Sequence, residues 1–207
     1  MSNIKTVLDE TPFQTAGPFL HIGCLPNSVS IKGVINKDLG IKPFINKSYD
    51  NLITITGSVF DGDGQALDDI MLETWQSDEN GSYSSESGFA RFVPDNLTKK
   101  FNLHTVKPGF VNNFDGKIQS PHILIAISSR GLNMTLNTRI YFEGDDLTND
   151  PLLSVVKNSR NNVSSLVSKK IDEDIYLFDI FLQGDKETVF LDIWYFKLRW
   201  RNYWPDL

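Results

Sequence analysis

The sequence predicts an all-β protein, an antiparallel β-sandwich with one or two short helices. Stretches in which apolar and polar residues alternate follow one another along the chain, as in Leu52-Ile53-Thr54-Ile55-Thr56. Turn signals rich in glycine and aspartate separate these stretches, as at Asp61-Gly62-Asp63-Gly64. Helical periodicity is rare. A series of half-buried strands of this kind is typical of two packed sheets.

The expected elements can be placed along the chain. We expect strands, in chain order, at residues 52–60, 70–76, 101–106, 121–128, 134–142, 175–182 and 188–196. Turns at Asp78-Glu79-Asn80-Gly81 and Gln183-Gly184-Asp185 punctuate the series. The expected helices cover residues 151–156, with Pro151 at the first helical position, and residues 162–167.

The length of 207 residues suits a single domain. We assign residues 1–193 to the sandwich, with an N-terminal arm, and residues 194–207 to an aromatic-rich C-terminal extension. Three of the four tryptophans lie in this extension. An exposed patch of this kind would be adhesive, so we expect it to pack on this chain or on a partner.

Composition excludes several classes of partner. Twenty basic and 26 acidic residues give a net charge of −6, which makes nucleic acid and anionic membranes unfavourable partners. The longest apolar run, near residues 189–196, is too short to span a membrane and carries Asp192. The N-terminus has no signal-peptide core, so we expect a cytoplasmic protein.

Residues that bind metals are scarce. His21, His104, His122 and Cys24 are the only histidines and cysteine, and none has a zinc-site spacing. His122 lies on an expected strand, where side chains two positions apart share a face. A second histidine at 124 could complete a chelating pair, but this position is Leu124. We interpret His122 as a buried, hydrogen-bonded histidine rather than a metal ligand.

An ordered set of segments resembles one family, the intradiol ring-cleavage dioxygenases, over residues 9 to 193. Within the family the set is most similar to the non-catalytic α subunits of heteromeric members. The segments are Thr11 to Gly23, Gly57-x-Val59-x-Asp61-x-x-Gly64, Glu73-x-Trp75-Gln76-x-Asp78-x-x-Gly81-x-Tyr83, His104 to Gly109, Pro121-His122-Ile123, Ser129 to Asn133, Thr138 to Phe142, Phe178-Asp179-Ile180 and Gln183-Gly184-x-x-Glu187-Thr188-Val189-Phe190.

The resemblance implies a non-haem ferric ion, held in the catalytic subunit by two tyrosines and two histidines. Only His122 matches one of these ligands, because Leu124 replaces the second histidine and residues 110–120 contain no tyrosine. The loop that holds the family's other tyrosine ligand is shortened here to residues 84–88, and Tyr83 matches a non-ligand tyrosine. We therefore expect no catalytic residue and no metal ligand in this chain, and Fe(III) in a partner β subunit.

The resemblance also implies a substrate and an assembly. The reaction would insert both atoms of O2 into protocatechuate, giving 3-carboxy-cis,cis-muconate, in a large hetero-oligomer of αβ pairs. Thr15, Ala16, Gly17, Pro18 and Arg130 match the residues that approach the substrate. Gly17 before Pro18 suits a rigid turn close to a flat ring, and Arg130 could orient the carboxylate. A solvated turn charge or an interface salt bridge is the alternative for Arg130.

Two other functions remain open from the sequence. One is a transthyretin-like sandwich that binds a small aromatic ligand without reaction. The other is a self-sufficient dioxygenase that recruits metal through His122 and tyrosines remote in the sequence.

Overall fold

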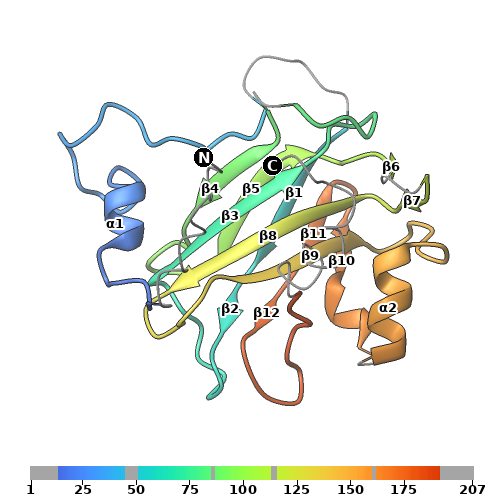
Figure 1. Ribbon diagram of the computed structural model, residues 1–207. Helices are drawn as coiled ribbons and strands as arrows, with labels where there is room; N and C mark the ends of the chain where they lie inside the picture. Colours follow the sequence, from blue (N-terminus) through green and yellow to red (C-terminus); the bar gives the residue numbers. More distant parts are fainter. Residues whose placement is uncertain (1–13, 45–50, 85–86, 113–115, 160–161, 192–207) are drawn as a thin grey trace, which may run out of the picture.

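The computed structural model describes residues 14–44, 51–84, 87–112, 116–159 and 162–191 (Figure 1). These residues form two α-helices, one 3₁₀ helix and twelve strands. The helices are α1 (Leu20–Cys24), α2 (Pro151–Ser159) and η1 (Val163–Leu166). The strands are β1 (Leu52–Gly57), β2 (Val59–Phe60), β3 (Ile70–Gln76), β4 (Phe89–Phe92), β5 (Phe101–Val106), β6 (Val111–Asn112), β7 (Ile118–Gln119), β8 (His122–Ser129), β9 (Leu136–Phe142), β10 (Val167–Asp172), β11 (Ile175–Leu177) and β12 (Ile180–Phe181).

Eight strands form one sheet that closes over a core in the manner of a sandwich. The strand order is β4-β3-β8-β9-β10-β11-β1-β5, and β2–β12 and β6–β7 form two further short pairs. Alternate residues of β3, β8 and β9 face alternate residues of β1 and β5 in one apolar cluster, which includes Ile55, Phe101, Ile123, Ile125 and Ile140. Burial of this apolar face supplies the main stabilisation of the domain, as period-two alternation predicts.

Strand pairing is not antiparallel throughout. β3–β4, β3–β8, β8–β9, β1–β5, β10–β11 and β6–β7 are antiparallel, whereas β1–β11, β9–β10 and β2–β12 are parallel. The predicted sandwich is therefore confirmed, with parallel pairs where the last strands return to the sheet. Alternation within a strand does not report the direction of its neighbour, so the sequence could not show these pairs.

A kink divides two of the predicted strands. A Cβ atom on Gly57 would lie 1.9 Å from the carbonyl oxygen of Phe178, so only glycine allows this close approach. Beside it, the Ser58 amide donates to Asp179 Oδ1 at 3.0 Å. The expected strand at 52–60 consequently splits into β1 and β2, and the expected strand at 175–182 splits into β11 and β12.

The helix α2 covers the outside of β9 and extends three residues beyond the predicted end at residue 156. Its apolar face joins Tyr141, Leu166 and Val189 in a second, smaller core cluster. Figure 1 shows α1 and α2 on opposite sides of the sheet. The short α1 was not predicted, because its sequence Leu-His-Ile-Gly-Cys carries no capping signal.

Other predicted elements need correction. The helix expected at 162–167 is the single 3₁₀ turn η1, and β10 begins at Val167. Residues 188–191 of the last expected strand form no strand, although the Leu191 amide donates to the Asn137 carbonyl at 2.7 Å. The assigned extension at 194–207 lies outside the described residues. No helix in the described part of the chain is long and apolar enough to cross a membrane.

Candidate functional site

One end of β8 brings the predicted arm residues and Arg130 together. The Gly131 amide, in the turn that follows β8, donates to Thr15 Oγ1 at 2.8 Å. The Thr15 hydroxyl in turn donates to the Ala16 carbonyl at 3.3 Å, and the Leu20 amide donates to the Gly17 carbonyl at 3.2 Å. The structure thus places Thr15, and with it the start of the arm, beside the Arg130 turn, although residues 15 and 130 are 115 positions apart in the sequence.

The arm presents an exposed surface next to this turn. Thr15, Gly17 and Pro18 are exposed, and the ring of Phe19 is 74% exposed. A Cβ atom on Gly17 would meet no atom of the other described residues, its two chain neighbours aside, within 4 Å. Packing within the chain therefore does not require glycine here, and the face of the arm is open to a neighbour.

Arg130 is an exposed cation that pairs with Asp69 of its own chain. Its Nη2 lies 3.0 Å from Oδ2 of Asp69, which directly precedes β3, and 65% of the Arg130 side chain is exposed. An exposed ion pair of this kind contributes about 0–1 kcal/mol, so the guanidinium is held in place but can still bind another carboxylate. Asp69 was not identified from the sequence, because nothing in it links residues 69 and 130.

The opposite end of β8 carries His122, about 25 Å away along the strand at roughly 3.3 Å per residue. Its side chain is buried, and Nδ1 lies 2.7 Å from the Ser120 carbonyl oxygen. A carbonyl only accepts, so Nδ1 carries the proton. Burial, together with the nearby Arg139 charge, lowers the pKa of His122 to about 4. His122 is therefore a neutral, hydrogen-bonded residue of the interior, as the sequence analysis predicted.

The neighbours of His122 come from β9 and β3. The register places Tyr141 opposite His122, and Arg139 opposite Leu124. Trp75 of β3 lies on the other side of Leu124 and stacks on Tyr83, with ring centroids 6.1 Å apart. Beside its one imidazole and the Tyr141 phenol, this face therefore has an apolar residue and a cation in the places where a metal centre would need further ligands.

Asp150 organises this end of the molecule. Its carboxylate accepts hydrogen bonds from the Leu152, Leu153 and Ser120 amides at 2.9, 3.0 and 2.9 Å, and from the Tyr141 hydroxyl at 3.2 Å. Asp150 is thus the N-cap of α2 and also fixes the entry to β8. Burial, partly offset by Arg139, raises the pKa of Tyr141 well above its usual range, so Tyr141 remains a protonated phenol. The sequence analysis overlooked Asp150, although an Asp-Pro pair before an apolar run is a helix-start signal.

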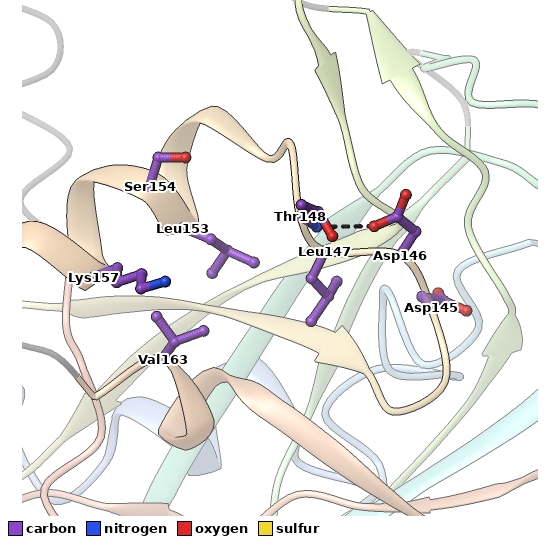
Figure 2. Close-up of a pocket in the computed structure, with 8 residues that line it drawn as sticks. All are labelled: Asp145, Asp146, Leu147, Thr148, Leu153, Ser154, Lys157 and Val163. Carbon is purple, nitrogen blue, oxygen red and sulfur yellow. Dashed lines mark hydrogen bonds between the residues drawn. The ribbon is translucent and has the colours of Figure 1, made fainter.

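A hollow of about 500 Å³ lies between α2 and the loop after β9 (Figure 2). Leu147, Leu153 and Val163 point into it and belong to, or pack against, the second core cluster. At its rim the Thr148 amide donates to Asp146 Oδ1 at 3.0 Å, and Asp145 pairs with Lys107 at 2.6 Å. Asp145 and Asp146 at this rim each have a partner within the chain, and the apolar lining of the hollow continues the second core cluster.

Comparison with known proteins identifies the family. The family model described as Dioxygenase matches residues 30–184 of this chain. The chain is 38% identical to the protocatechuate 3,4-dioxygenase alpha chain of Pseudomonas putida, over 90% of this chain and 98% of the relative. It is 32% identical to the alpha chain of the same name from Burkholderia cepacia, over 91% of this chain and all of the relative.

The chain belongs to the intradiol dioxygenase family. This confirms the predicted family and places the protein among ring-cleaving oxidoreductases.

Solved structures of other intradiol dioxygenases share the fold. The dioxygenase domain of a carbohydrate-binding fusion from Streptomyces sp. SirexAA-E superposes with a TM-score of 0.53 at 20% identity, over 69% of this chain and 86% of that one. Catechol 1,2-dioxygenase from Acinetobacter sp. ADP1 gives a TM-score of 0.53 at 16% identity, over 80% and 69%. At these identities the likeness concerns the fold, and it confirms the dioxygenase-type sandwich.

Non-haem iron is the family's cofactor in general, but the described residues around His122 do not fit it. In the described part of the chain, no three His, Cys, Asp or Glu side chains converge on one point. His122 has Leu124 and Arg139 beside it, and Nδ1 is already engaged by a carbonyl. A guanidinium next to the single imidazole opposes any bound cation. The described residues therefore form the dioxygenase sandwich without a centre at His122 that could hold ferric ion.

Proposed function

We propose that this chain is the α subunit of a protocatechuate 3,4-dioxygenase, which acts only together with a β subunit that holds Fe(III). The observation that carries the proposal is the contrast between an intact dioxygenase sandwich and a His122 position without a second imidazole. The two relatives named above, both alpha chains, support it, and their name implies a partner chain. The assembly we propose is a large hetero-oligomer of αβ pairs in the cytoplasm.

In this proposal the arm and Arg130 form one wall of the substrate pocket of the partner. Thr15, Ala16, Gly17 and Pro18 would limit the pocket and exclude water, since their exposed face lies beside the Arg130 turn. Arg130 would bind the carboxylate of protocatechuate while Asp69 holds the guanidinium in place. No catalytic residue and no metal ligand is assigned to this chain; the ring-cleaving chemistry with O2 would belong to the partner.

Reconstitution tests this proposal. We would express the full-length chain alone and together with a β subunit of a relative, then measure bound iron and oxygen uptake with protocatechuate. The expected result is iron and ring cleavage only in the mixture. Iron and activity in the chain alone would instead identify a self-sufficient dioxygenase. Binding of protocatechuate by the chain alone, with no gain on adding the β subunit, would identify a binding module.

A further inference from the structure

Arg139 lies on β9 opposite Leu124, at the His122 end of β8. Two imidazoles at positions 122 and 124 would share a face and hold an ion between them and the side chains of β9 opposite. The residues directly opposite are Tyr141 and Arg139. Trp75, Leu124 and Arg139 form one row across β3, β8 and β9, so the guanidinium lies beside the position of the missing second imidazole.

The contacts of Arg139 fix the guanidinium in this position. Nη1 donates to Gln119 Oε1 at 2.8 Å and lies 3.3 Å from the Tyr141 hydroxyl oxygen. The Tyr141 hydroxyl in turn donates a hydrogen bond to the buried carboxylate of Asp150. In the part of the chain that the structure describes, four ion pairs are formed, and none involves Arg139. This half-buried cation is therefore held by neutral oxygen acceptors, not neutralised by a carboxylate.

The charge of Arg139 contributes to the pKa shifts of three neighbouring side chains. Besides burial, it is a cause of the lowered pKa of His122, and it offsets part of the rise that burial causes in the pKa of Tyr141 and Tyr83. One positive charge thus acts on an imidazole and two phenols, the same kinds of group that a bound cation would act on. The hydrogen-bond network from Gln119 through Tyr141 to Asp150 is complete with the guanidinium in place.

We propose that Arg139 is a built-in cation that replaces a metal ion at this end of the sheet and keeps metals out. The replacement has two parts. The guanidinium occupies part of the sheet face that His122 and Leu124 share, where it contacts Gln119 and Tyr141. Its charge repels a divalent ion a few ångströms away in a partly desolvated setting. Loss of the second imidazole at position 124 is then only half of the reason why the site is metal-free.

Zinc binding to full-length variants tests this inference by isothermal titration with Zn²⁺ alone as the probe. Leu124→His restores a two-imidazole pair and should still bind zinc no better than the native chain. Leu124→His with Arg139→Gln should bind zinc at least about tenfold more tightly, because the repelling charge is gone while a polar side chain remains. The matched control is Leu124→His with Arg130→Gln, which removes the same charge at the far end of β8 and should not gain affinity.

A conservative variant separates charge from shape. Leu124→His with Arg139→Lys keeps a cation and should remain unable to bind zinc. Thermal unfolding followed by circular dichroism would show whether each variant folds. Zinc binding by Leu124→His alone that is about tenfold tighter than that of the native chain would overturn the inference, even if a double variant failed to fold. So would a folded Arg139→Gln double variant that gains no affinity. These readouts do not depend on ring cleavage, so their failure is distinguishable from a failure of the proposed α-subunit role.

Discussion

The two ends of β8 have opposite characters. At the His122 end the imidazole, Tyr141 and Asp150 are buried and joined by hydrogen bonds in the interior. At the Arg130 end the guanidinium is mostly exposed, and the arm beside it is open to solvent. The strand therefore links a closed region, where ionisable groups serve stability, with an open region that can serve a partner. Within this family, the described residues keep the fold without a second imidazole beside His122.

The largest effect should come from removing Asp150. Asp150→Ala leaves four donors without their acceptor, three of them backbone amides, so we expect a loss of about 4 kcal/mol in the free energy of unfolding. Urea denaturation measures it. Asp146→Ala, in the exposed loop nearby, is the matched control and should cost about 0.5 kcal/mol. Equal losses for the two variants would show that Asp150 does not organise this end.

The second-largest effect should be a pH dependence of stability that arises from His122, at the buried end of β8. The pKa of His122 falls from 6.5 in the unfolded chain to about 4 in the folded one, so the unfolded state binds more protons between these values. The free energy of unfolding should therefore decrease by about 3 kcal/mol as the pH falls from 7 to 4. His122→Gln should remove this slope in urea titrations at each pH. A slope that persists unchanged in the variant would contradict the account of His122.

At the open end, Arg130→Ala should alter recognition more than stability. In the reconstituted complex we expect kcat/KM for protocatechuate to fall about tenfold, because a charge-assisted contact to the carboxylate is lost. Turnover of catechol, which has no carboxylate, should stay nearly unchanged, and unfolding should change by less than about 1 kcal/mol. Asp69→Asn is the companion variant, since it keeps Arg130 but releases its partner. Equal losses on both substrates would remove the carboxylate role.

The smallest effect should come from the arm. Thr15→Val removes the oxygen that accepts the Gly131 amide, but water can replace it at this exposed site, so stability should change by less than about 1 kcal/mol. We expect KM for protocatechuate to rise about threefold, which corresponds to about 0.6 kcal/mol in placing the arm. Thr15→Ser, which retains the hydroxyl, should restore the native KM. A threefold rise that persists with serine would point to the methyl group instead.

Local patterns revealed much of the fold but not its long-range pairings. The alternation at 70–76 and 101–106 predicted β3 and β5 with their observed bounds, and Pro151 marked the first residue of α2. The breaks at Gly57 and Phe178 escaped prediction, because they arise from the close approach of two segments far apart in the sequence. The same holds for parallel pairing, which side-chain alternation does not encode.

The candidate site shows the same limit. Leu124 in place of a second histidine was visible in the sequence, as were the arm and Arg130 through the family resemblance. The role of Arg139 was not, because it depends on the register that sets residue 139 of β9 opposite residue 124 of β8. Asp69 and Asp150 likewise act through contacts that only the folded chain creates.

Iron content of the αβ complex tests the central claim most directly. We would substitute His122→Gln in this chain, purify the complex with a β subunit and count iron atoms per pair by mass spectrometry against the unsubstituted complex. The account predicts the same iron content in both, because His122 holds a carbonyl of its own chain rather than a metal. Loss of iron in proportion to the substituted chain, in a complex that stays folded and assembled, would contradict it.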